Sequence, residues 1–174
     1  MKIKKMTHFA MLITFALIIH TVESLLPTLP VYGAKLGLAN VITLLAFVMY
    51  DFSAALFIGV TRTILGSIFA GTFMGTAFYL SFSGAVISTL AMAAGMYLWR
   101  RGKISLIAVS IMGAVAHNTA QVTVASLLIG NFGPMRVYLP LLLLLAIPTG
   151  FFTGLAVTYS QKALAKIIAD IQHD

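Results

Sequence analysis

The chain has 174 residues, of which 60% are hydrophobic and only 9% are charged. Soluble domains carry about 25% charged residues, so a globule of this size could not cover its own apolar surface, and lipid must be its solvent. The formal net charge of +7 would suggest nucleic-acid binding in a soluble protein. Here the basic residues lie mostly at the ends of apolar runs, which is the pattern of membrane orientation, so no nucleic-acid partner is expected. The sequence contains no cysteine, which excludes disulfides, thiol chemistry and thiolate metal sites.

Six apolar runs predict an all-α membrane protein that forms a single integral membrane domain over residues 1–174. The first run continues through Leu26 without a closing Ala-x-Ala pair, which favours a retained span over a cleaved signal peptide. The second run is short for the ~20 residues that a bilayer requires, so we expect it to be tilted or partly interfacial. The predicted spans are 7–26, 36–50, 51–71, 76–99, 104–129 and 137–161.

The distribution of basic residues predicts the orientation of these six transmembrane helices. With the N-terminus inside, the loops and ends place eight basic residues on the inner side and two on the outer side, with Arg62 inside a span. This bias predicts a multi-pass protein of the cell membrane with both termini cytoplasmic. The inner residues are Lys2, Lys4, Lys5, Arg100, Arg101, Lys103, Lys162 and Lys166, and the outer ones are Lys35 and Arg136.

The stretch Gly33–Asn40 should lie at the outer mouth of the bundle, just after Pro27 and Pro30. Prolines disfavour a helix on arrival, and two glycines flank Lys35. Lys35 and Asn40 are donors that could close over a ligand. The alternative is a simple re-entry turn with a lysine that reaches toward the interface.

Ionisable side chains inside a bilayer are costly unless they are paired or hydrated, so each one marks a candidate site. Glu23 lies near the outer end of the first span, with His20 three residues earlier on the same face. Arg62 lies near the middle of the third span. The pair Glu23–Arg62 could hold two helices together, and such a pair is compatible with ligand binding.

The fifth span carries three strong hydrogen-bonding side chains within about one turn. His117 and Gln121 are four residues apart and share a helix face, and Asn118 is adjacent. Two interpretations remain open: a knot of hydrogen bonds between helices, or the wall of a ligand site. Elsewhere, Gly71-xxx-Gly75 and Gly150-xxx-Gly154 have the spacing that lets helices approach closely.

Together the polar groups predict a cavity that opens outward and is closed inward. The excess of basic groups there would suit an anionic or carboxylate-bearing small molecule. No enzyme motif is present, so we expect no catalytic residues, no cofactor and no metal site. The candidate ligand-binding residues are Glu23, Lys35, Asn40, Arg62, His117, Asn118 and Gln121.

Three motifs in this order resemble the Gx transporter family, which is often labelled heptaprenyl diphosphate synthase component I. They are Gly33-x-Lys35-Leu36-Gly37-Leu38-Ala39-Asn40, Arg62-xxx-Gly66-Ser67 and His117-Asn118-xx-Gln121. The family is similar to the S components of energy-coupling factor (ECF) transporters.

This resemblance implies a six-helix bundle of the ECF S-component type that captures a small molecule from outside for uptake. It also implies ECF transmembrane and ATPase subunits as partners, which dock on small residues of the first helix; Ala10, Thr14 and Ala16 are a loose match. The alternative implied function is a non-transport membrane subunit that supports isoprenoid or quinone metabolism or flavin-linked extracellular electron transfer. The ligand would then be related to isoprenoids, quinones or flavins.

Overall fold

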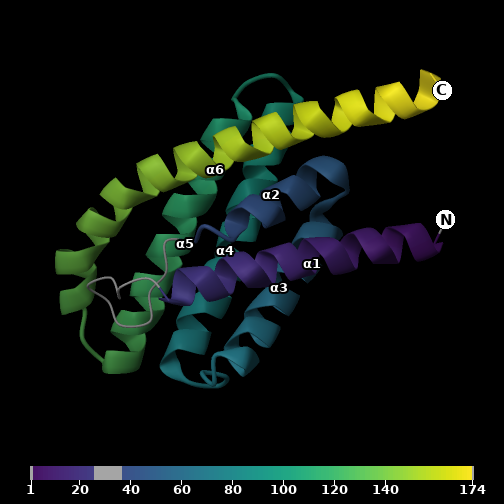
Figure 1. The fold of residues 1–174 in the computed structure, drawn as a ribbon. Helices are drawn as coiled ribbons and strands as arrows, with labels where there is room; N and C mark the ends of the chain where they lie inside the picture. The colour runs from purple at the N-terminus through teal and green to yellow at the C-terminus, as the bar shows by residue number, and fades with distance from the viewer. Residues whose placement is uncertain (1, 26–36, 174) are drawn as a thin grey trace.

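The structure is a computed structural model that describes the backbone of residues 2–25 and 37–173 and the side chains of residues 6–23 and 37–162. Within these residues the chain is entirely helical, as predicted (Figure 1). Residues 33–36, which are half of the predicted outer-mouth segment and include Lys35, lie outside the described residues. The helices are α1 (Lys2–Leu25), α2 (Asn40–Met49), α3 (Phe52–Phe69), α4 (Thr76–Arg100), α5 (Leu106–Ile129) and α6 (Gly133–His173).

Short polar residues and glycines set several of the helix ends. The carboxylate of Asp51 accepts a hydrogen bond from the backbone amide of Ala54 at 2.8 Å and so caps the start of α3. Ser105 caps α5 through the amide of Ala108 at 3.1 Å. At the other end of α5, Gly130 has φ 69°, a left-handed conformation that side chains disfavour, and it stops the helix there.

Five of the described helices are long and apolar enough to cross a membrane, but α2 is not one of them. The helix α2 has ten residues, which at 1.5 Å per residue covers about half of the ~30 Å hydrocarbon core, so the span predicted over 36–50 contains a shorter helix. The helix that contains the predicted span 137–161 begins at Gly133 and continues to His173. This helix contains Pro140 and Pro148 and follows a curved path in Figure 1 without breaking.

Small residues allow α5 to pack tightly between α4 and α6. A Cβ atom added to Gly150 would lie 2.6 Å from the Cα of Ile111, and one added to Gly154 would lie 2.7 Å from the Cα of Ile107. The close approach predicted for Gly150-xxx-Gly154 is thus confirmed. The same prediction for Gly71-xxx-Gly75 is wrong, because the two glycines belong to the turn between α3 and α4 and nothing lies within 4 Å of a Cβ on Gly71.

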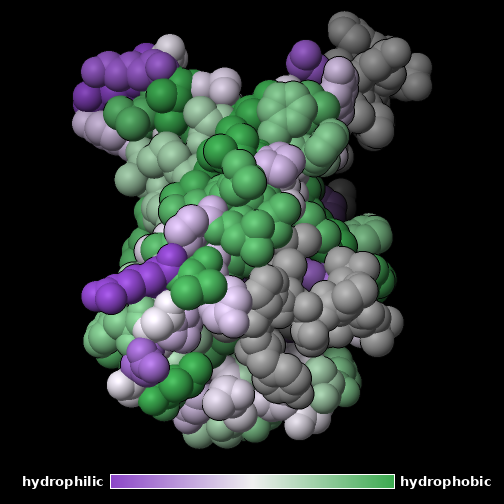
Figure 2. Space-filling model, turned by 90° about the vertical axis from the view of Figure 1, so that its left-hand side faces the viewer, coloured by the Kyte–Doolittle hydropathy of each residue, from purple (hydrophilic) through white to green (hydrophobic). Residues whose placement is uncertain are grey.

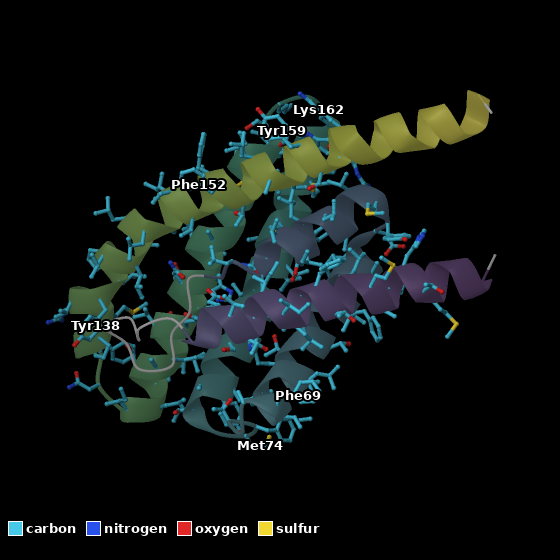
Figure 3. All side chains as sticks on the ribbon, in the orientation of Figure 1. Phe69, Met74, Tyr138, Phe152, Tyr159 and Lys162 are labelled. Carbon is cyan, nitrogen blue, oxygen red and sulfur yellow. The ribbon has the colours of Figure 1, made fainter. Side chains whose placement is uncertain are left out.

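The outer surface of the bundle is apolar. Figure 2 shows hydrophobic residues over most of one face, with hydrophilic residues gathered at its upper corners and left edge. Phe69, Met74 and Phe152 are 74%, 60% and 66% exposed and project away from the bundle in Figure 3. Water would not tolerate so many large exposed apolar side chains, whereas lipid would. The structure thus describes a multi-pass membrane protein whose polar groups lie inside.

Candidate functional site

A small cavity lies in the bundle where α1, α3, α4 and α5 meet the residues that lead into α2. It has room for about one water molecule in this structure. Every side chain at its wall is buried, and most are polar or charged, although the surrounding helices are apolar. The lining residues are His20, Glu23, Gly37, Arg62, Thr63, Ser81 and His117.

Glu23, near the end of α1, ties that helix to the start of α2. One of its carboxylate oxygens accepts hydrogen bonds from the backbone amides of Gly37 and Leu38, the latter at 3.2 Å. These two amides precede Asn40, the first residue of α2, and leaving them without an acceptor inside a membrane would cost several kcal/mol. Glu23 therefore fixes, from another helix, the turn that leads into α2.

Arg62, in the middle of α3, forms the second wall of the cavity. It is 2% exposed, and its guanidinium donates to the side-chain oxygen of Asn40 at 2.8 Å. The same oxygen accepts a longer bond of 3.5 Å from the hydroxyl of Ser88 on α4. Glu23 also interacts electrostatically with Arg62. Four helices and two opposite charges thus meet around Arg62, which keeps the buried arginine from standing alone in an apolar environment.

The rings of His20 and His117 each lie directly against a glycine of a neighbouring helix. A Cβ on Gly84 would lie 2.7 Å from Cε1 of His117, and a Cβ on Gly66 would lie 2.5 Å from Cδ2 of His20. Only a residue without a side chain lets the rings come so close to the helix backbones. On its other side His117 faces Gly37, where a Cβ would lie 3.1 Å from the ring. The His117 ring is therefore held between α4 and the residues that lead into α2.

Gln121 fixes the orientation of the His117 ring. Its amide nitrogen lies 2.8 Å from Nε2 of His117, one helical turn away on α5. This contact fixes the plane of the imidazole ring against α5. The guanidinium of Arg62 and the carboxylate of Glu23 also lie at the cavity wall.

Residues 12–160 match the family described as heptaprenyl diphosphate synthase component I. The chain belongs to this family. No curated protein and no solved structure matches the chain significantly. The resemblance seen in the sequence motifs is therefore confirmed. In this member of the family, several buried polar residues surround one small cavity.

Most of the predicted site residues lie at the cavity or are bonded to a residue that lines it. Glu23, Arg62 and His117 line the cavity, Asn40 is bonded to Arg62, and Gln121 is bonded to His117. His20, recognised in the sequence as sharing a face with Glu23, also lies at the cavity wall.

Asn118 is not among the residues that line the cavity. Its amide nitrogen donates to the backbone oxygen of Leu142 on α6 at 2.7 Å, and its side chain is fully buried. The geometry of Asn118 therefore matches the interhelical hydrogen bond that was the alternative interpretation of this turn. Lys35 lies outside the described residues, so its predicted role stays a prediction.

Sequence reasoning missed Thr63 and Ser81 as cavity residues. Both are small hydroxyl residues in apolar helices, and each of their helices carries a row of small residues on the buried face. On α4 the row is Ser81, Gly84 and Ser88, spaced three and four residues apart. This spacing was a signal that the face of α4 approaches a polar site closely. Among the described residues, no group of three or more His, Cys, Asp or Glu side chains could hold a metal ion.

Proposed function

We propose that the chain is the substrate-binding membrane subunit of a transporter, similar to an ECF S component, and that it captures a small molecule from outside for uptake. The observation that carries this proposal is the small cavity with two opposite charges and two histidines among apolar helices. Buried ionisable groups are costly in a membrane and are kept where a ligand or ion pathway needs them.

The proposed topology places both termini in the cytoplasm and the cavity toward the outer face of the cell membrane. Figure 1 shows the N- and C-terminal ends of α1 and α6 on the same side of the bundle, which supports this orientation together with the basic residues near them. The proposed arrangement keeps six membrane segments, an even number, of which five are helices long enough to cross and the other contains the short α2. The proposed partners are lipid, a small-molecule ligand, and ECF transmembrane and ATPase subunits.

The topology is tested by cysteine labelling, which is clean because the sequence has no cysteine of its own. Single cysteines are introduced at Gly102 and at Gly71, in the turns at opposite ends of α4. In intact cells an impermeant maleimide should label the Gly71→Cys variant and label Gly102→Cys only after permeabilisation. The reverse pattern would show that the cavity faces the cytoplasm and would contradict capture from outside.

The family description favours a second candidate function. The matched family is described as a component of heptaprenyl diphosphate synthase, which points to a membrane subunit that supports isoprenoid or quinone metabolism without transport. Native mass spectrometry of the purified full chain separates the two proposals through the small molecule that stays bound. A water-soluble, vitamin-like molecule that cells expressing the chain accumulate in labelled form supports uptake. A prenyl lipid or quinone that cells do not accumulate supports the second candidate and contradicts the first.

A further inference from the structure

Two hydrogen-bond donors, one on a residue that lines the cavity and one beside the lining residue Gly37, are used by nothing in the described protein. We infer that it receives the oxygen atom of an uncharged acceptor group, such as a ketone or amide carbonyl, at a position shared by Arg62 and Asn40. This inference rests on the proposed function, and it names the chemical class of ligand that the site would take. It also differs from the anionic ligand that the sequence alone suggests.

The first donor is the Nε–H group of Arg62. Within the described residues Nε has no hydrogen-bond partner, although the side chain is 98% buried. Arginine stays protonated in proteins, so this N–H remains a donor in every state of the site. A buried donor without an acceptor is destabilising, and a ligand oxygen would supply the missing acceptor on binding.

The second donor is the amide nitrogen of Asn40, which also lacks a partner in the part of the chain that the structure describes. The positions of the oxygen and the nitrogen in the Asn40 side chain cannot be swapped. Its oxygen accepts from Arg62, and arginine has no acceptor to offer to an amide nitrogen. The nitrogen lies against the cavity wall, 3.0 Å from the position of a Cβ on Gly37.

The charge of the site argues against an anion. The guanidinium of Arg62 is already balanced by the carboxylate of Glu23, which lines the same cavity. A second carboxylate would leave a net negative charge in a buried site, and desolvating an unbalanced ion costs several kcal/mol. A carbonyl oxygen accepts both donors and leaves the charges balanced. The limited space, with room for about one water molecule, suits a single oxygen atom entering ahead of a larger ligand.

The test uses two probes of nearly the same shape, formamide and formate, on the full chain in lipid nanodiscs. The sequence has four arginines, at positions 62, 100, 101 and 136, so arginine-selective ¹⁵N labelling gives four Nε–H resonances. The resonance of Arg62 is the one that the variant Arg62→Lys lacks. Formamide should shift this resonance in a saturable manner. Formate at the same concentration and constant ionic strength should shift it at least tenfold less.

Two variants test the site, with one control. Asn40→Asp keeps the shape and the acceptor but replaces the donor with a charged oxygen, so the dissociation constant for formamide should rise at least about fivefold, equivalent to about 1 kcal/mol. Ser110→Ala removes a hydroxyl that is bonded to Thr153 between α5 and α6, away from the cavity, and should leave formamide binding unchanged. Arg62→Lys keeps the charge but lacks the Nε–H group of arginine, so it should bind formamide more weakly, as measured by ligand-observed NMR. If Arg62→Lys does not fold, the result for Asn40→Asp decides the test.

The outcomes separate this inference from the proposed function. A larger shift with formate than with formamide, or no shift with either probe, would overturn the inference. If a co-purified ligand is identified and its removal leaves the Arg62 resonance unchanged, the inference fails while the proposed function stands. If no ligand is bound and no uptake is found, the proposed function fails, whatever the probes do.

Discussion

Replacing Gly84 by alanine should destabilise the protein by forcing His117 out of its seat. An added Cβ would lie 2.7 Å from Cε1 and 2.8 Å from Nδ1 of that ring, about 0.7 Å closer than ordinary contact. The ring has little room to retreat, because Gly37 lies on its other side and Gln121 holds Nε2 at 2.8 Å. Overpacking of this kind costs about 1–3 kcal/mol, and alanine gives back about 0.5–1 kcal/mol in helix propensity. The net fall in unfolding free energy should be about 1–2 kcal/mol.

Gly59→Ala provides a matched control. It is the same substitution in the middle of α3, but its new Cβ would meet its nearest neighbour, the hydroxyl of Thr89, at 3.5 Å, which is ordinary contact. This variant should be neutral or slightly more stable than the natural chain. Equilibrium unfolding in mixed micelles measures both variants under the same conditions, with the fluorescence of the single tryptophan as the signal.

A double variant shows whether the strain acts through the histidine. If it does, Gly84→Ala should cost much less in a chain that already carries His117→Ala, because a methyl group leaves space for the new Cβ. The coupling between the two substitutions should be about 1–2 kcal/mol. Equal stability of Gly84→Ala and Gly59→Ala, or strictly additive losses in the double variant, would refute the idea that Gly84 exists to seat the ring.

Two further predictions concern the polar contacts. Asn118→Ala should lower the stability of the ligand-free protein by about 0.6–1.7 kcal/mol, as for interhelical hydrogen bonds in membranes, and leave ligand affinity per folded molecule unchanged. Loss of affinity without loss of stability would instead place Asn118 in the site. Glu23→Gln combined with Arg62→Gln should cost less than the sum of the two single substitutions, with a coupling of about 0.5–3 kcal/mol in the same unfolding assay, and additive losses would show that the two side chains do not stabilise one another.

The helical architecture could be predicted from the sequence because lipid allows so few alternatives. Apolar runs of about 20 residues in a chain this hydrophobic can only become helices, since every backbone group must be satisfied internally. The length of the second helix was harder to predict. The apolar residues of that run extend over 36–50, but α2 has only ten residues. Composition does not reveal where such a helix begins, because the residues just before it bond to Glu23 on α1.

The site was partly predictable for the reverse reason. Glu23, Arg62 and His117 are conspicuous in apolar helices, so their burial in one place follows from the cost of charge in lipid. Asn118 shows where such reasoning stops. It is as polar as its neighbour His117, but a step of one residue turns a side chain by about 100° around the helix, and the neighbour toward which it turns is α6. Which face of α5 meets which helix is decided by packing, including the close approach at Gly150.

The balance of Glu23 against Arg62 also has an electrical consequence. A unit charge that crosses the whole membrane gains or loses about 2.3 kcal/mol for each 100 mV of potential. Two opposite charges at the wall of one cavity form a dipole instead, and the field does little net work on them when the helices that carry them shift together. An uncharged head group entering between them would bring no charge of its own into the field. Occupancy of the site should then be the same in energised and de-energised vesicles, so the site could stay filled when a cell loses its membrane potential.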